Sequence, residues 1–136
     1  MAIVKVEEAK SLTPGREVSL IAMVLRTWQV RDSGMCLVGD ETGLMRIGLG
    51  DGNALQSGRG DLAPTGQVQE GCTYLFEGLA VRVYTGGWHS LELSAYGRVL
   101  ASDQPISVTA DEKYIQQVYK ILTGLERKRQ RLGAKI

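Results

Sequence analysis

The side chains best suited to chemistry in this 136-residue chain are arginines and aromatic rings, not the groups of an active site. Planar guanidinium groups pair with phosphate oxygens, and aromatic rings stack on nucleobases. Arg26 could likewise pair with a phosphate, and Leu37 and Leu44 favour contact with something apolar, either a base or a protein. The candidate binding residues are Trp28, Arg31, Leu37, Arg46, Arg82, Tyr84 and Trp88.

Each candidate also has a plain structural alternative. A surface arginine can be a solvated charge, and a tryptophan can cap an apolar core with its indole N–H hydrogen-bonded. Trp28 lies at the end of an apolar run, whereas Trp88 follows two glycines that are typical of a loop. This placement favours Trp88 over Trp28 as a stacking residue.

The sequence contains no catalytic or metal-binding pattern. His89 is the single histidine and has no nucleophile or carboxylate arrangement around it. Residues 48–52 are glycine-rich but do not open a helix, as a dinucleotide-binding loop does. Cys36 and Cys72 lack further ligands at metal-binding spacing, so we expect two reduced thiols in the core. We therefore expect a protein that is not an enzyme and holds no cofactor or metal.

Charge is unevenly distributed along the chain, although the formal net charge is only +1. Residues 126–136 carry five basic residues and one acidic residue, a net charge of +4, which leaves −3 for the rest. An acidic body disfavours tight, nonspecific binding to nucleic acid, because such binding relies on many phosphate contacts.

No apolar run approaches the ~20 residues that span a bilayer, and residues 1–8 lack the pattern of a signal peptide. We expect a soluble intracellular protein, cytoplasmic in a prokaryote or nuclear in a eukaryote, with no membrane partner.

A hairpin over residues 35–51 is the element from which the fold is predicted. Two short apolar alternations flank residues 40–43, where glycine can adopt a positive φ and aspartate can hydrogen-bond its own backbone. One face of the hairpin carries Leu37, Leu44, Arg46, Gly48 and Gly50. The opposite face is more apolar and is predicted to meet the core; it carries Cys36, Val38, Met45, Ile47 and Leu49.

Three further strands are predicted, over residues 18–28, 72–84 and 89–100. The first is apolar on both faces, as expected of a strand that curls and serves two sides of a barrel. Gly78, inside the second, indicates a bulge or bend. Residues 52–71 lack periodicity and exceed the ~12 to 15 residues of an ordinary loop, so we expect a mobile or functional connection. The strand order predicts an all-β protein built as a closed five-stranded Greek-key barrel.

An amphipathic helix is predicted near the C-terminus, with Thr109 or Asp111 as its N-cap. We therefore divide the chain into a barrel domain, residues 1–105, and a C-terminal helix with a basic tail, residues 106–136. Such a helix either lies on its own barrel or binds a partner protein or a second copy of the chain. The residues of its apolar stripe are Tyr114, Ile115, Val118, Leu122 and Leu125.

With these elements in place, the chain resembles the single-stranded-DNA-binding OB-fold proteins of the replication protein A type, especially the short archaeal and eukaryotic members with one OB domain. The resemblance spans about residues 4–100 and rests on landmarks in a fixed order. They are Leu12, Pro14 and Gly15 before the first strand, residues 39–43 at the hairpin, Gly71, Tyr84, Gly86, Tyr96 and Gly97.

The resemblance implies a binding groove on the outer face of the second and third strands, flanked by the loops that join strands one to two and four to five. It implies single-stranded DNA as the ligand, with RNA as an alternative, and a role in DNA replication or repair within a replication protein A-like complex. Two aromatic positions of the family fall on Gly50 and Ala80, so Tyr84 is the expected stacking position that this chain retains. The alternative function is an assembly subunit whose C-terminal helix and apolar barrel face bind partner proteins, with little affinity for nucleic acid.

Overall fold

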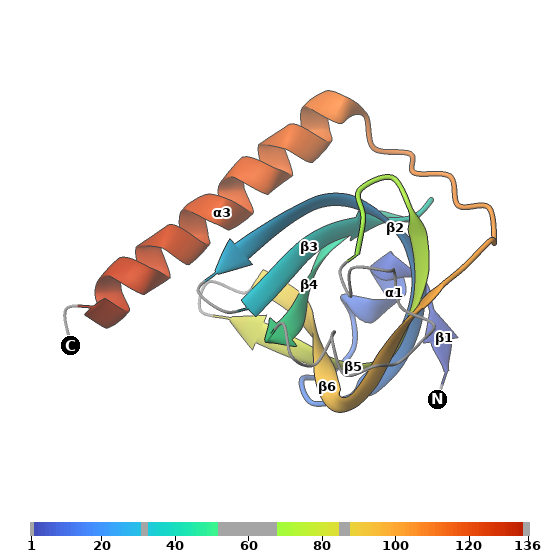
Figure 1. Ribbon diagram of the computed structural model, residues 1–136, viewed down its shortest axis with the longest axis horizontal. Coiled ribbons are helices and arrows are strands. Elements are labelled where there is room, and N and C mark those ends of the chain that lie inside the picture. The colour runs from blue at the N-terminus through green and yellow to red at the C-terminus, as the bar shows by residue number, and fades with distance from the viewer. Residues whose placement is uncertain (1, 31–32, 52–67, 85–87, 135–136) are drawn as a thin grey trace.

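Five strands of the computed structural model close into a barrel (Figure 1). They are β2 (Glu17–Val30), β3 (Ser33–Gly39), β4 (Leu44–Asp51), β5 (Thr73–Tyr84) and β6 (Trp88–Ala101). Neighbouring strands follow the order β2-β3-β4-β6-β5, and β5 pairs back onto β2. These pairings are antiparallel except that between β4 and β6, which is parallel. The predicted Greek-key barrel of the OB-fold type, with a helix after it, is confirmed.

The structure describes residues 2–30, 33–51, 68–84 and 88–134, with the backbone alone for Asp51, Tyr84, Trp88 and residues 126–134. Most of the predicted long connection and the predicted site residue Arg31 lie outside these ranges. Within them, no helix has both the length and the apolar character needed to cross a membrane.

Strand β2 serves two sides of the barrel, as its doubly apolar sequence predicted. Its first half pairs with β5 and its second half pairs with β3. The register shifts between Val24 and Arg26, where the strand passes from one partner to the other. A bulge of this kind bends a strand and increases its twist, which lets 14 residues wrap around the core.

The barrel interior is filled by alternate residues of all five strands. Phe76, Leu20, Leu79 and Leu91 are fully buried there. The face of the hairpin that was predicted to meet the core does so, because Cys36, Val38, Met45, Ile47 and Leu49 all belong to this cluster. The alternation along the hairpin therefore distinguishes its core face from its outer face, as predicted.

The bend predicted at Gly78 is present. Glu77 pairs with Arg98 and Leu79 pairs with Leu93, so residues 94–97 form a bulge opposite a single glycine. Gly78 has a φ of +75°, and a Cβ atom at this position would lie 2.9 Å from the Cα atom of Gly97. A close approach of two backbones at a positive φ requires glycine.

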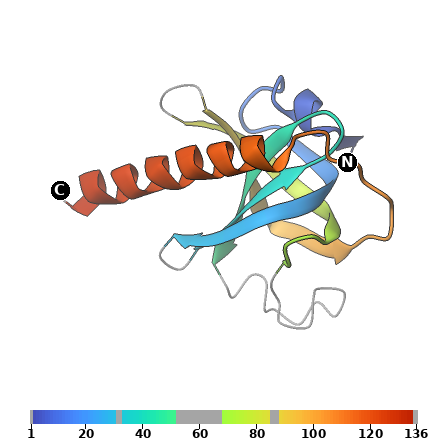
Figure 2. The same cartoon turned by 90° about the horizontal axis from the view of Figure 1, so that it is seen from above.

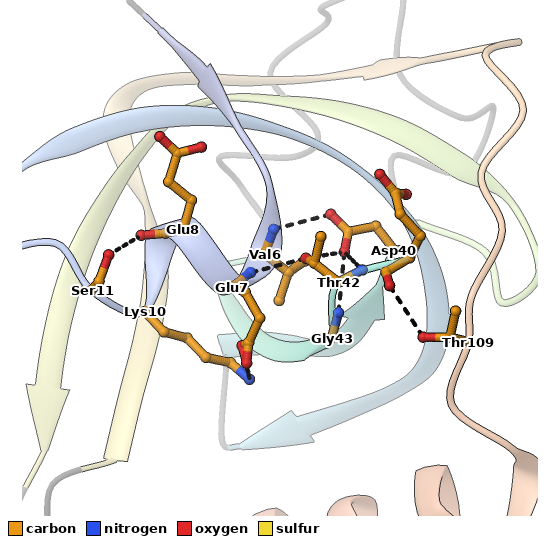
Figure 3. A network of polar contacts seen from close by, with 10 residues as sticks. Val6, Glu7, Glu8, Lys10, Ser11, Asp40, Thr42, Gly43 and Thr109 are labelled. Carbon is orange, nitrogen blue, oxygen red and sulfur yellow. Dashed lines mark hydrogen bonds and ion pairs between the residues drawn. The ribbon is translucent and has the colours of Figure 1, made fainter.

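The β3–β4 turn is organised by a buried carboxylate (Figure 3). The Oδ1 atom of Asp40 accepts hydrogen bonds from the Thr42 amide at 2.8 Å, the Thr42 hydroxyl at 2.6 Å and the Gly43 amide at 3.3 Å. Its Oδ2 atom accepts from the Val6 amide at 3.0 Å. Burial raises the pKa of Asp40, but the hydrogen bonds from Thr42, Val6 and Gly43 outweigh it and hold the pKa below its usual value.

The sequence did not predict the N-terminal elements β1 (Ile3–Val4) and α1 (Val6–Ala9). Strand β1 pairs in parallel with β2. Helix α1 has no side-chain cap from its own N-cap residue Lys5. Instead, the amide of Val6, the first residue of the helix, donates its hydrogen bond to the Asp40 carboxylate. The helix therefore depends on a residue far away in the sequence.

The expectation that both cysteines are core thiols was wrong for one of them. Cys36 is fully buried, and burial raises the pKa of its thiol while the charge of Arg46 acts in the opposite direction. Cys72 is exposed, because β5 begins one residue later than predicted and Cys72 precedes it.

Helix α3 (Glu112–Ala134) follows a linker of residues 102–111 that leaves the end of β6. It runs beside β2 and across the outside of the barrel, and its C-terminal end extends past the strands (Figures 1 and 2). The boundary predicted at residues 105 and 106 falls within this linker.

Candidate nucleic-acid interface

The outer face of the barrel carries a row of residues that runs across all five strands. Arg26 on β2 pairs with Leu37 on β3, and Leu37 pairs with Arg46 on β4. Arg46 in turn pairs with Ser90 on β6, and Ser90 pairs with Arg82 on β5. The register thus brings three of the arginines from the sequence analysis into one row.

A second row runs parallel to the first, toward the end of the barrel at which the β2–β3 hairpin lies. Its members are Trp28, Met35, Gly48, Glu92 and Ala80. A Cβ atom on Gly48 would lie 3.4 Å from Cγ of Glu92 and 3.6 Å from Sδ of Met35. The small residue at position 48 therefore lets the side chains on both sides of it lie close to the sheet.

Helix α3 covers one half of this face. Leu37 is fully buried, and Leu44, Ile115 and Leu122 are 6%, 5% and 7% exposed. These four residues form a second apolar cluster outside the barrel. The cluster is completed by partly buried residues: Leu25, Trp28, Val108, Ala110, Val118 and Tyr119. The apolar contact expected for Leu37 and Leu44 is thus made with the C-terminal helix of the same chain.

Trp28 lies at the edge of this second cluster. Its ring packs edge-to-face against Tyr119, with 5.5 Å between the ring centroids and 75° between the ring planes. The Nε1 atom is buried and has no hydrogen-bond partner among the described residues. The ring thus lies against α3, and its N–H lacks the hydrogen bond expected of a tryptophan that caps a core. Stacking of Trp28 on a base stays a prediction.

Arg46 is held within the face and does not project from it. The side chain is buried, and its Nη1 atom donates a hydrogen bond to the Ser90 hydroxyl at 2.5 Å. Its Nη2 atom lies 3.1 Å from Sδ of Met35. The guanidinium therefore places a positive charge inside the face, at the point where β4 and β6 run side by side.

Arg82 and the strand ends beyond it lie on the half of the face that is distant from α3. Arg82 is exposed on β5. Two residues farther along, the backbone of Tyr84 pairs with that of Trp88, which closes the described ladder between β5 and β6. Arg82, Tyr84 and Trp88 therefore lie close together at one end of the β5–β6 ladder. Arg46 is far from them in the sequence but lies in the same row as Arg82.

The stripe predicted to bind a partner is divided between two sides of α3. Ile115 and Leu122 are buried against the barrel, and Val118 packs beside them. Tyr114 is 54% exposed, and Leu125 is partly exposed. Tyr119 was not among the residues predicted for this stripe, although its spacing from Ile115 and Leu122 is that of one helical face.

Polar contacts hold the beginning of the helix in place. Arg26 forms an ion pair with Glu112, and the Thr109 hydroxyl donates a hydrogen bond to the Glu41 carbonyl at 3.2 Å. Glu41 also forms an ion pair with Lys5, at 2.6 Å. The start of α3, the β3–β4 turn and the N-terminal segment therefore meet at one end of the barrel.

A cavity of about 370 Å³ lies beside Trp28. Its lining combines the second half of β2, the start of β3, one core leucine of β4 and a valine that precedes β5: Thr27, Trp28, Gln29, Gly34, Met35, Leu49 and Val68. Across the described part of the chain, no group of three or more His, Cys, Asp or Glu residues is arranged to hold a metal ion.

No protein-family model matches this chain, and no curated protein matches it by sequence. Solved structures do match it. The OB domain of MM0293 from Methanosarcina mazei has a TM-score of 0.62 and 19% identity, over 82% of this chain and 93% of that one. The similarity, at this level of identity, is one of fold.

Several of the similar structures were solved with DNA, among them the following two. Fission yeast Pot1 with single-stranded DNA has a TM-score of 0.55 and 14% identity, over 70% of this chain and 38% of that one. The Ifi202 HINa domain with a 20-base-pair duplex has a TM-score of 0.57 and 10% identity, over 76% of this chain and 48% of that one. The chain thus spans less than half of either of these two proteins.

Proposed function

We propose that this chain binds single-stranded nucleic acid, and DNA in particular, on the outer face of β4, β6 and β5. The observation that carries the proposal is the row in which Arg46, Ser90 and Arg82 are consecutive partners, with the Tyr84–Trp88 pair beside it. Cations and aromatic rings on adjacent positions of a sheet match the alternating phosphates and bases of a single strand.

Each residue has a distinct role in this proposal. Arg82, which is exposed, pairs with a phosphate, and the rings of Tyr84 and Trp88 stack on bases. Arg46 contributes a fixed positive charge from within the face, and Ser90 holds its guanidinium in place. Trp28 flanks the same face on β2. Arg31, which lies outside the described residues, is proposed from the sequence alone as a further phosphate contact. The role is one of binding, without catalysis.

The DNA-bound structures of Pot1 and the HINa domain support the proposal by showing that OB barrels of this shape occur in proteins that contact DNA. Single strands fit this chain better than a duplex, because stacking on Tyr84 and Trp88 requires unpaired bases. RNA offers the same bases and phosphates, so it is the alternative ligand.

Replacement of Arg82 tests the proposal against a matched control. Arg82→Gln removes one phosphate contact, so the slope of log K against log salt for oligo(dT) should become shallower by about 0.7. Arg98→Gln removes the same charge from an exposed arginine that pairs with Glu77 at 2.7 Å, away from the proposed site, and should leave the slope unchanged. Fluorescence anisotropy at several salt concentrations measures both. Equal slopes for the two variants would exclude Arg82 from the interface.

A role in DNA replication or repair, within a replication protein A-like assembly, is the cellular function that fits such binding. Helix α3 is the proposed assembly element. It continues for 12 residues beyond Leu122, which corresponds to about 18 Å. Leu122 is the last buried residue among those of α3 whose side chains are described.

The second candidate function is that of an assembly subunit with little affinity for nucleic acid. The exposed side of α3 favours it, because Tyr114 is 54% exposed and Ile121 is 48% exposed, seven residues apart on one face. Sedimentation equilibrium of the wild type and of Ile121→Ser tests it. Self-association of the wild type that is lost in the variant would support this candidate function. A wild type that is monomeric at all concentrations and binds DNA would show that α3 does not mediate self-association.

A further inference from the structure

The contacts that α3 makes with the barrel resemble in chemistry the contacts that a single strand would make. Glu112 presents a carboxylate to Arg26, where a nucleic acid would present a phosphate. Tyr119 presents an aromatic ring to Trp28, where a nucleic acid would present a base. Arg26 and Trp28 lie two residues apart on the same outward side of β2, so one helix occupies both contacts.

The seat of α3 on the barrel is defined by the buried residues Leu37, Leu44, Ile115 and Leu122. Its described polar contacts lie at the start of the helix: the Arg26–Glu112 ion pair, and the hydrogen bond from Thr109, which precedes the helix, to the Glu41 carbonyl. The Arg26–Glu112 pair lies at the surface, with 74% of the Glu112 side chain exposed, and exposed ion pairs contribute little to stability. The Nε1 atom of Trp28 is buried in the seat without a partner among the described residues, which costs free energy whenever the helix is in place.

We infer that α3 and single-stranded nucleic acid compete for the outer face of β2 and β3, so that lifting the first three turns of α3 opens a second part of the binding surface. The inference rests on the proposed function. In the lifted state, the Arg26 guanidinium is released from Glu112 to pair with a phosphate. The Trp28 ring and its N–H are likewise released, to stack on a base and to donate a hydrogen bond.

The consequence is a measurable reduction in affinity while the helix is seated. When only a fraction of molecules has the helix lifted, the apparent dissociation constant equals the intrinsic constant divided by that fraction. A substitution that weakens the seat without touching the ligand should therefore tighten binding. A substitution on the solvent side of the same helix should have no such effect.

Leu122→Ala and Gln117→Ala supply this comparison in the full chain. Leu122 is 7% exposed and lies in the seat, whereas Gln117 is exposed on the same helix. Anisotropy titration of labelled oligo(dT) at low salt should show binding roughly tenfold tighter for Leu122→Ala than for wild type, and unchanged binding for Gln117→Ala. Glu112→Gln should tighten binding by roughly twofold, because it removes the carboxylate that occupies Arg26.

Hydrogen exchange of the wild type provides a second measurement that does not depend on a variant. Amides of residues 112–125 should exchange faster when oligo(dT) is bound, because the ligand holds the helix in its lifted state. Circular dichroism and a cooperative melt establish that each variant remains folded. If Leu122→Ala does not fold, Glu112→Gln and hydrogen exchange still decide the matter.

Two results overturn the inference, and they differ in what else they affect. If the wild type binds oligo(dT) but folded Leu122→Ala binds no tighter, and exchange of residues 112–125 does not rise, α3 is a permanent part of the fold and the proposed function stands. If neither the wild type nor Leu122→Ala binds at low salt, the proposed function fails along with the inference.

Discussion

The carboxylate of Asp40 should be the most sensitive polar group of the fold, and Asp40→Asn is the substitution that tests this. The side chain is fully buried and accepts four hydrogen bonds, three at Oδ1 and one at Oδ2. Asparagine has nearly the same shape but only one oxygen. If that oxygen faces Thr42 and Gly43, the amide nitrogen meets the Val6 N–H, and a buried donor is left unsatisfied.

The magnitude follows from these contacts. An unsatisfied buried donor costs about 1–3 kcal/mol. The remaining hydrogen bonds lose the assistance of the charge, which roughly halves their strength, or about 1 kcal/mol each for the two short ones. Relief from burying a charge offsets part of the loss. The net destabilisation is expected to be about 2–4 kcal/mol.

The dependence of stability on pH provides a second test of the Asp40 carboxylate. Because the pKa of Asp40 is lower in the folded protein than its ordinary value, the charged carboxylate stabilises the fold above that ordinary value. This contribution is lost as the pH falls through the folded pKa. Asp40→Asn should lack this acid-dependent part of the stability.

Urea unfolding at neutral pH and at several pH values below 5 measures both effects. Glu41→Gln is the matched control, because Glu41 is an exposed neighbour whose ion pair with Lys5 lies at the surface, so its effect should be small. An Asp40→Asn protein with wild-type stability and a wild-type pH profile would refute the account of the turn.

Two further predictions concern residues with unusual surroundings. Gly78→Ala should lower stability by about 2 kcal/mol or more in thermal unfolding, because it forces alanine to a φ of +75° and toward the Gly97 backbone. Gly124→Ala, in open space on α3, should instead raise stability slightly. Equal effects of the two substitutions would contradict this prediction. A thiol reagent should modify Cys72 rapidly in the native protein and Cys36 only after unfolding, because Cys36 is fully buried and burial raises its pKa; rapid reaction of both thiols would show that the barrel opens readily.

The barrel could be predicted from the sequence because its signals are local. Alternation in the hairpin assigned Cys36 and Ile47 to the core, and Asp40 with Gly43 marked the turn. The apolar run of β2 predicted a strand with two partners, and Gly78 predicted the bulge. Each inference needed only neighbouring residues.

The elements that were missed depend on contacts between distant residues. Helix α1 has four residues and is too short to show a periodicity, and its cap comes from Asp40, 34 positions away. The burial of Arg46 follows from Ser90, which the parallel pairing of β4 and β6 brings beside it. The spacing of residues along one element indicates neither the cap of α1 nor the burial of Arg46.

The contact made by the apolar stripe of α3 also could not be predicted from the sequence. Periodicity identified an apolar stripe that includes Ile115 and Leu122, but it could not distinguish a partner protein from the barrel of the same chain. The structure places both residues on Leu37 and Leu44. The face that was expected to meet a ligand is thus partly occupied by the helix that was expected to meet a partner.

The proposed function requires that the outer face of this barrel binds a single strand through stacked bases and paired phosphates. The most direct measurement is anisotropy of labelled oligo(dT) and of a duplex of equal length, each titrated with the wild type at about 50 mM and 200 mM salt. We expect preferential binding of the single strand, with weaker binding at the higher salt. Absence of binding to oligo(dT) at the lower salt, or a preference for the duplex, would contradict it.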